Sequence, residues 1–362
     1  MRKGTEIDIP ARIGQLLREF PVVVLQGARG SGVSTVAQQL ADTHHGRVVS
    51  VTSGHPEVGD GTRLTVFDGF DDAENRKDLL TRVHAAAERT HRPGAFLLTS
   101  HTDLRREDDT AGWTVSVTLG VPRRGEGTAA VGDAVAEVVD AAAGGPAPDT
   151  APLTAPLTAP LTTASLAVGA HDLDAGGRRA FYRDHLTSLV THDIAGVAHV
   201  EDPSRITAVL TALAHRGAGE LTVAELAGET GIPSSTLSGY LGLLERLFTV
   251  ATVPGWTPGL AAEEIQRPLA FLPDAGLVAY LDGPDDPLAH VLATLHRQSV
   301  WSREHYRVYH YRNGNGRCVD CVVELADGRV IGVQVTSDPS HLDFLRGELG
   351  DRFLAGLVCE AR

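Results

Sequence analysis

The most constraining feature of the sequence is a glycine-rich segment between a short apolar run and a helix-forming stretch. It reads Gly27-Ala-Arg-Gly-Ser-Gly32-Val33-Ser34 and follows the valine-rich residues 22–25. Its spacing is that of the phosphate-binding motif G-x-x-x-x-G-K followed by Ser or Thr, in which glycines let the backbone wrap around an anion. A buried strand that leads into such a loop and a helix predicts an α/β fold on a parallel sheet.

The loop lacks the residue that normally carries its positive charge. The lysine that bridges the β- and γ-phosphates in this motif is replaced by Val33, and the chain holds only two lysines, Lys3 and Lys77. Arg29 lies in the loop, but its rigid guanidinium is not equivalent to a compact ammonium. We therefore expect a loop that binds phosphate through its backbone without the charge that supports hydrolysis.

A carboxylate follows the second strand-like run, residues 63–67, and suits magnesium. It is Asp68, whereas the glutamate expected beside it to activate water is Gly69. We expect ATP with magnesium as the cofactor, and Ser34 and Asp68 as the metal-binding residues. A glycine-rich turn that binds nothing stays open as an alternative. The expected nucleotide-binding residues are Gly27, Arg29, Gly30, Ser31, Gly32, Val33, Ser34, Thr35 and Asp68.

Strand-like and helix-like segments alternate through the first third of the chain, as in a parallel α/β sheet. The expected strands are 22–25, 63–67 and 94–99, and the expected helices are 35–43 and 79–89. A low-complexity stretch then interrupts the pattern, with three copies of Ala-Pro-Leu-Thr in residues 151–162. Because proline removes backbone donors and disfavours helix before it, residues 141–165 are expected to form an extended linker or loop.

The remainder of the chain is first helical and then mixed. Residues 221–241 have the pattern of a helix-turn-helix, with a turn at Gly231 and a second helix starting near Pro233. Further on, we expect a helix at 288–296, strands at 308–311, 318–325 and 330–335, and hairpin turns at 313–316 and 327–328.

Motifs spread over nearly the whole chain carry a resemblance to a known family. They are Phe20-Pro-Val-Val-Val-Leu-Gln-Gly-Ala-Arg29, Arg92-Pro-Gly-Ala-Phe-Leu-Leu-Thr-Ser100, Tyr182, His192-Asp193-Ile194, Gly239-Tyr-Leu-Gly-Leu-Leu-Glu245, Arg267-Pro-Leu-Ala-Phe-Leu-Pro-Asp-Ala-Gly-Leu277, Tyr309-His-Tyr-Arg312, Arg317-Cys-Val-Asp320, Gly332-Val-Gln-Val-Thr336 and Phe353-Leu-Ala-Gly-Leu357. In this order they resemble the prokaryotic AAA-type P-loop ATPases that carry a winged helix and a C-terminal restriction-endonuclease-like domain (domain-of-unknown-function 4143 type).

This resemblance implies a three-module α/β architecture. It comprises a P-loop NTPase-like parallel sheet domain at 1–140, the linker at 141–165, a helical winged-helix domain at 166–255 and a restriction-endonuclease-like α/β domain at 256–362. Val33 and Gly69 replace the family's P-loop lysine and Walker B glutamate. In addition, the family has an arginine shortly after its sensor strand, and the corresponding residues here, Ala111-Gly-Trp113, lack it.

The nuclease motif of that family is also degraded. Its Glu-Val-Asp … Glu-Val-Lys reads Cys318-Val-Asp320 … Gln334-Val-Thr336. Only Asp320 remains, and Glu324 lies on the same face of the expected strand. Two carboxylates are few for a hard cation, so nuclease activity is not expected.

The charge of the chain bears on its partners. The formal net charge is −14, and the expected recognition helix, residues 233–245, contains neither Lys nor Arg. Since phosphate neutralisation supplies most of the affinity for DNA, a packing or protein-interaction role is favoured over DNA binding. No apolar run approaches the ~18 residues of a membrane span, and three cysteines form no disulfide framework, which indicates a cytoplasmic protein.

We therefore expect a pseudo-ATPase, a nucleotide-binding or purely structural interaction protein with a protein partner. Two alternatives stay open. One is a slow ATPase that uses Arg29 in place of the lysine, and the other is a DNA-binding regulator that acts through the winged helix.

Overall fold

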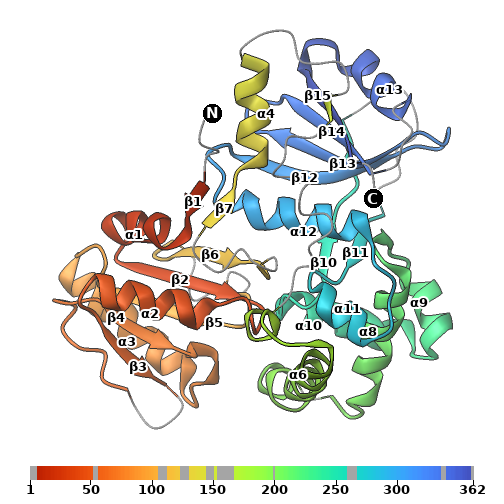
Figure 1. The fold of residues 1–362 in the computed structure, drawn as a ribbon. Helices are drawn as coiled ribbons and strands as arrows, with labels where there is room; N and C mark the ends of the chain where they lie inside the picture. Colours follow the sequence, from red (N-terminus) through yellow and green to blue (C-terminus); the bar gives the residue numbers. More distant parts are fainter. Residues whose placement is uncertain are drawn as a thin grey trace.

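The computed structural model of the protein is shown in Figure 1. It describes residues 6–51, 56–104, 112–122, 130–143, 151–152, 167–198, 200–258, 267–335 and 340–359.

The helices are α1 (Ile9–Glu19), α2 (Val33–Thr43), α3 (Arg76–Thr90), α4 (Ala134–Ala143), α6 (Ala175–Ser188), α7 (Ile194–Val197), α8 (Ser204–Arg216), α9 (Val223–Thr230), α10 (Ser234–Arg246), α11 (Ala275–Tyr280), α12 (Pro287–Ser299) and α13 (Ser340–Leu349). Short 3-10 turns are η1 (Phe70–Asp72), η4 (Val168–Ala170) and η6 (Gly350–Arg352), and η5 (Leu189–Asp193) is a π-helix. The strands are β1 (Glu6–Asp8), β2 (Val22–Gly27), β3 (Arg47–Ser50), β4 (Thr65–Asp68), β5 (Phe96–Ser100), β6 (Val115–Leu119), β7 (Ala130–Gly132), β8 (Ala151–Pro152), β9 (Gly219–Glu220), β10 (Ala251–Val253), β11 (Leu269–Phe271), β12 (Tyr306–Arg312), β13 (Cys318–Leu325), β14 (Val330–Gln334) and β15 (Phe353–Val358).

A five-stranded parallel sheet forms the N-terminal module, in the order β3-β4-β5-β2-β6. All six residues of β2 are buried. Val23 and Leu25 pack with α1 and α2 on one face, while Val22 and Val24 pack with α3 on the other. The predicted parallel α/β sheet is confirmed, because strands covered on both faces read as continuous apolar runs.

A second five-stranded sheet, in the order β12-β13-β14-β15-β8, forms the C-terminal module. Its first three strands are antiparallel, which confirms the two predicted hairpins, and β14, β15 and β8 are parallel. One face packs against α4 and α12, and the other packs against α13 (Figure 1).

Two segments from the middle of the chain belong to this second sheet. Helix α4 places Ala134, Val135 and Val138 in its core, although the helix precedes the Ala-Pro-Leu-Thr repeats. The first of these repeats supplies β8, which pairs with β15 at Leu357 and Val358. The remaining repeats, from residue 153 onward, lie outside the described residues. The helical module, residues 167–280, thus follows a segment that is already part of the C-terminal sheet.

The helical module has its own core between α6 and α11. Helices α9 and α10 are joined by a three-residue turn that begins at Gly231, whose left-handed backbone (φ = 68°) ends α9. An antiparallel sheet in the order β10-β11-β9 accompanies them, with β9 before α9 and with β10 and β11 after α10.

Asp133 joins α4 to the segment that follows α12. It is fully buried, and its carboxylate accepts hydrogen bonds from Ala136 N (3.1 Å), Ser302 Oγ (2.8 Å) and Arg303 N (2.8 Å). Replacing Asp133 by alanine should lower the free energy of unfolding by about 2–4 kcal/mol, because three donors lose a buried acceptor at once. Urea denaturation monitored by circular dichroism measures this loss.

Asp327 offers a matched control, since it also accepts bonds from a backbone N–H and a side chain but lies half exposed in a turn. Its alanine variant should lose less than about 1 kcal/mol. Equal losses in the two variants would contradict the role given to Asp133.

Candidate functional site

The glycine-rich loop lies at the carboxyl end of β2, an interior strand between β5 and β6, where ligands bind in open α/β sheets. Gly30 and Gly32 adopt left-handed backbones with φ of 87° and 91°, which glycine reaches without strain. No described side chain caps α2, so the N–H groups of its first turn have no acceptor within the helix. The loop therefore presents a concave set of N–H groups that suits an anion.

A buried hydroxyl inside the loop fits such an anion. Ser31 is 3 % exposed, and its Oγ has no hydrogen-bond partner among the described residues. It lies against Gly27, where an added Cβ would come within 2.8 Å of this oxygen. Because a buried hydroxyl without a partner costs free energy, a phosphate oxygen would be a favourable acceptor here.

Ser34 and Asp68 are brought together beside the loop. Ser34 Oγ donates to Asp68 Oδ1 over 2.9 Å, and Thr99 Oγ1 donates to the same oxygen over 2.7 Å. These oxygens come from α2, β4 and β5, and oxygen ligands of this kind suit magnesium. The sequence motifs predicted Ser34 and Asp68 but not Thr99, whose only signal was that it is a polar residue near the end of β5.

The two positions at which the motif would have a lysine and a glutamate, Val33 and Gly69, carry no charge. Val33 is 1 % exposed and packs in the core between α1, α2 and the sheet. Gly69 has a left-handed backbone (φ = 73°), and its N–H donates to Thr99 Oγ1 over 2.8 Å. Thr35 is exposed in the first turn of α2.

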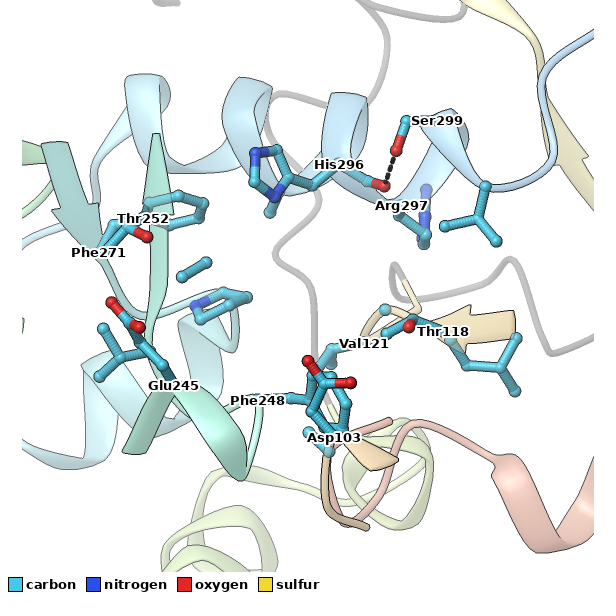
Figure 2. A pocket seen from close by; sticks show the side chains of 18 residues that line it. Asp103, Thr118, Val121, Glu245, Phe248, Thr252, Phe271, His296, Arg297 and Ser299 are labelled. Atoms are coloured by element: carbon cyan, nitrogen blue, oxygen red, sulfur yellow. Dashed lines mark hydrogen bonds between the residues drawn. The ribbon is translucent and has the colours of Figure 1, made fainter. Parts of the chain in front are cut away.

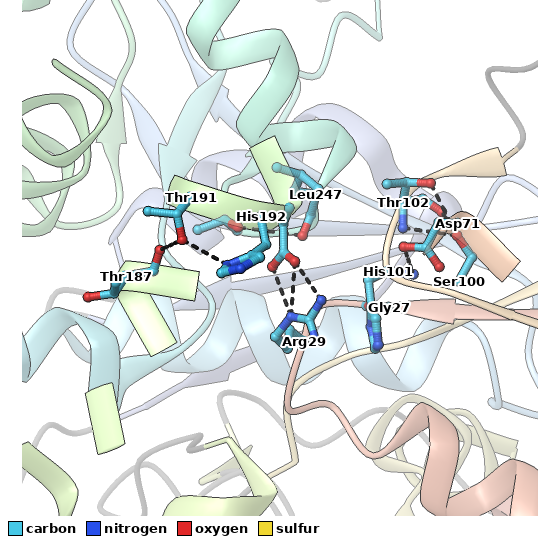
Figure 3. Close-up of polar contacts among 12 residues, drawn as sticks. Gly27, Arg29, Asp71, Ser100, His101, Thr102, Thr187, Thr191, His192 and Leu247 are labelled. Atoms are coloured by element: carbon cyan, nitrogen blue, oxygen red, sulfur yellow. Dashed lines mark hydrogen bonds and ion pairs between the residues drawn. The ribbon is translucent and has the colours of Figure 1, made fainter. Parts of the chain in front are cut away.

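Arg29 points away from its own loop and binds the helical module. Its guanidinium donates to both carboxylate oxygens of Asp193 in η5, from Nε over 2.9 and 3.1 Å and from Nη2 over 2.5 Å (Figure 3). This hydrogen bonding raises the pKa of Arg29, against the opposing effect of its burial. Arg29, the possible substitute for the motif's lysine, is therefore held in an ion pair with the helical module.

A second contact covers the outside of the loop. Val168 N donates to Gly30 O over 2.8 Å, and a Cβ added at Gly30 would lie 2.7 Å from that of Ala167. The buried Tyr182 hydroxyl accepts from Ala167 N (3.1 Å) and donates to Asp274 Oδ1 (2.8 Å). One hydrogen-bonded chain thus runs from the loop to α11, which Asp274 caps.

Two histidines, His101 and His185, lie near the loop. His101 Nδ1 lies 3.1 Å from Gly27 O, and its backbone N–H donates to Asp71 (Figure 3). Burial raises the pKa of Asp71 and lowers the pKa of His185, which lies near Arg29 and Asp193. The sequence carried no motif for these residues, since they converge from different modules.

A cavity of about 310 Å³ adjoins the loop where the three modules meet (Figure 2). Its lining includes Ala28 of the loop, Phe248 after α10, and His296 and Arg297 of α12. Burial lowers the pKa of His296 to about 4 and that of Arg297 to about 10. His296 is consequently neutral near pH 7.

The residues compared with a nuclease motif, Asp320 and Glu324, belong to no cluster of metal ligands among the described residues. Asp320 Oδ2 accepts from Val335 N over 2.9 Å, and burial raises the pKa of this carboxyl. Glu324 instead lies 3.4 Å from Arg352 Nη2, and Gln334 is buried. Thr336 lies outside the described residues.

Comparisons with known proteins give partial matches. A family model described as a domain of unknown function (DUF8612) matches residues 169–288, from η4 to the start of α12. No curated protein matches the chain in sequence. None of the described helices is both long enough and apolar enough to cross a membrane.

Two solved structures of P-loop ATPases are similar to the chain. The Walker-type ATPase PABY2304 of Pyrococcus abyssi shares 12 % sequence identity, with a TM-score of 0.43 over 75 % of this chain and 94 % of that one. RuvB of Thermotoga maritima shares 16 %, with a TM-score of 0.30 over 68 % of this chain and 89 % of that one. Both similarities are low.

The carboxyl of Asp274 should make stability depend on pH. Burial raises its pKa to about 6, although Tyr182, Leu277 and Gly276 donate hydrogen bonds to it. The folded chain therefore binds this proton more tightly than the unfolded chain does. The resulting stabilisation is fully present below about pH 4 and is lost as the pH rises through 6, by about 2–3 kcal/mol.

Asp274→Asn should remove this pH dependence, because the amide stays neutral and keeps an acceptor oxygen. Urea midpoints of the two proteins between pH 4 and 7 measure the effect. The midpoint of the variant, relative to that of the parent chain, should increase as the pH rises. Asp174→Asn changes an exposed carboxylate that caps α6 in a similar way and serves as the control. A constant difference between parent and Asp274→Asn would refute the assignment.

Proposed function

We propose that the protein binds a nucleoside triphosphate with magnesium at the glycine-rich loop and uses it as a structural signal, with little or no hydrolysis. The Ser34–Asp68 hydrogen bond of 2.9 Å beside the uncapped start of α2 carries this proposal. It supports a magnesium site next to a phosphate-binding backbone. The orphaned Ser31 hydroxyl supports the same reading.

The charges that hydrolysis requires are not supplied by the described residues at the loop. The lysine position is the buried Val33, and Gly69 provides no carboxylate to activate water. Arg29 is engaged by Asp193, so it does not neutralise charge that develops on a transferred phosphoryl group. Binding survives these losses better than turnover does, because backbone N–H groups hold phosphate without side-chain charge.

Residues 166–255 are proposed to be a winged-helix module that packs against the P-loop module and binds a protein partner. The turn between α9 and α10, followed by β10 and β11, supports the winged-helix reading. The C-terminal end of α10 accepts a bond from Asp103 N at Arg246 O (2.9 Å), so it contacts the sheet module. Nearby Arg216 is paired with Glu225 and Glu229, which leaves little positive charge for DNA.

Residues 256–362 are proposed to be a restriction-endonuclease-like module without nuclease activity. The engagement of Asp320 by Val335 N and of Glu324 by Arg352 supports this. The three thiols, Cys318, Cys321 and Cys359, are unlinked, which suits the reducing cytoplasm proposed for the chain.

Millimolar Mg-ATP should raise the melting temperature of the protein by about 2 °C or more, since a ligand that binds only the folded state stabilises it. Gly32→Ala should abolish the shift, because a side chain strains the left-handed backbone at this position. Gly328→Ala introduces comparable strain (φ = 83°) in the turn after β13 and should retain it. No shift in the parent chain would refute nucleotide binding.

Ser34→Ala and Asp68→Asn should remove the magnesium-dependent part of this shift and leave the part seen with ATP and EDTA. Phosphate release by the parent chain should stay at the level of a no-enzyme control. ATP turnover that disappears in Asp68→Ala would instead overturn the pseudoenzyme proposal.

A further inference from the structure

The free edges of two sheets face each other across a cleft of about 390 Å³. Strand β10 is the edge of the β10-β11-β9 sheet, and β12 is the edge of the C-terminal sheet. Thr252 and Pro254 line the cleft on the β10 side, and residues 306–309 line it on the β12 side. Helix α12 contributes His296 and Ser299.

The two edges are joined at one end of the cleft only. Gly255 and His310 form an isolated parallel bridge, in which His310 N donates to Pro254 O (3.2 Å) and Trp256 N donates to His310 O (2.7 Å). Beyond this bridge the described strands form no ladder with each other. Among the described residues, hydrogen bonds thus join the two strand edges at this bridge and not along the rest of the cleft.

The bridge fixes which backbone groups face the cleft. Backbone groups alternate in direction along a strand, so Thr252 faces the cleft as Pro254 does, and Val308 and Tyr306 face it as His310 does. The bond from Ala326 N to His305 O agrees, because it points the alternate residues of this strand toward β13. None of the described residues pairs with the cleft-facing groups of Thr252, Tyr306 and Val308.

We infer that this cleft binds an extended peptide segment of a partner protein, which adds a strand between β10 and β12 and carries a carboxylate opposite Arg307. Unpaired strand edges are templates for such addition, and both edges present backbone groups to the cleft. The cleft runs along four residues of β12, so about 13 Å of extended chain fits, at ~3.3 Å per residue. This inference is independent of nucleotide binding.

Charge and alternation define the partner segment. Tyr306 and Val308 are buried toward α12, with the Tyr306 hydroxyl donating to Leu295 O, so apolar side chains of the segment belong on that face. Arg307 is exposed on the opposite face and forms no ion pair with any described residue. Its cross-strand neighbour Glu324 pairs with Arg352 instead. A carboxylate beside Arg307 therefore gains an ion pair that the chain itself leaves unmade.

His296 adds no competing positive charge inside the cleft, because it is neutral near pH 7. The cleft also shares Thr252, His296 and Ser299 with the 310 Å³ cavity that reaches Ala28. A bound segment would therefore lie close to the glycine-rich loop.

The test uses the full chain and fluorescein-labelled pentapeptides, with fluorescence anisotropy as the readout. The acidic probe is acetyl-Val-Glu-Val-Glu-Val, and its counterparts are the same peptide with alternate amides N-methylated and a version with Lys in place of Glu. The acidic probe should bind about tenfold more tightly than either counterpart, because only it offers both the backbone donors and the carboxylate. Arg307→Glu should reverse the preference between the Glu and Lys peptides.

Two variants separate local effects from loss of folding. Arg329→Glu reverses an exposed arginine in the turn after β13 and should leave the preference unchanged. Val308→Pro removes an N–H that faces the cleft and should weaken binding of the acidic probe. An edge strand tolerates a proline at such a position. Hydrogen exchange should show the amides of Thr252, Tyr306 and Val308 exposed in the free chain and protected by the acidic probe.

Four outcomes would contradict peptide binding of this kind. Equal binding of the N-methylated peptide would overturn strand addition, and equal binding of the Lys peptide would overturn the charge assignment. Absence of both binding at millimolar peptide and amide protection would refute the docking site. Protection that grows with protein concentration alone would show a second copy of the chain as the occupant and refute the partner segment.

Discussion

The buried carboxylate of Asp274 is the constraint on which the arrangement of the modules depends. It accepts bonds from the backbone of α11 and from Tyr182, and Tyr182 in turn holds Ala167 against Gly30. A buried acceptor of this kind is costly unless each bond is made, so the donors have little freedom to move. The outer surface of the glycine-rich loop is therefore fixed by a residue far from it in the sequence.

The loop consequently has two kinds of contact with different chemistry. Its inner surface keeps backbone N–H groups, the Ser31 hydroxyl and the Ser34–Asp68 pair, all suited to oxygen-rich ligands. Its outer surface holds the helical module through Gly30 and through the Arg29–Asp193 ion pair. Arg29, the cation of the loop, connects two modules, and Val33, at the position of the motif's lysine, is part of the core. Under the proposed function, a nucleotide bound at this loop would alter the contacts between the modules without being hydrolysed.

The sequence predicted the elements whose signals are local. Strand β13 matches its predicted bounds because it lies between a turn of Asn and Gly residues and a turn of Asp and Gly. The Ser34–Asp68 neighbourhood follows from a motif with a known geometry. Strand β3 was missed because it is largely exposed and lacks an apolar run. The Arg29–Asp193 pair joins residues 164 positions apart, and the sheet partner of α4 is equally remote. Such contacts depend on how modules pack, which periodicity and spacing do not encode.

The placement of α4 has a consequence for synthesis of the chain. The helix donates from Ala134 N to Gln298 in α12, 164 residues later, and also packs with β15 near the C-terminus. At about 5–20 residues per second, ribosomes need roughly 10–30 s to make the intervening chain. Throughout that time the apolar surface of Ala134, Val135 and Val138 lacks its partners. A nascent chain that stalls in this interval exposes the apolar surface of α4, so chaperones are expected to bind it at this stage.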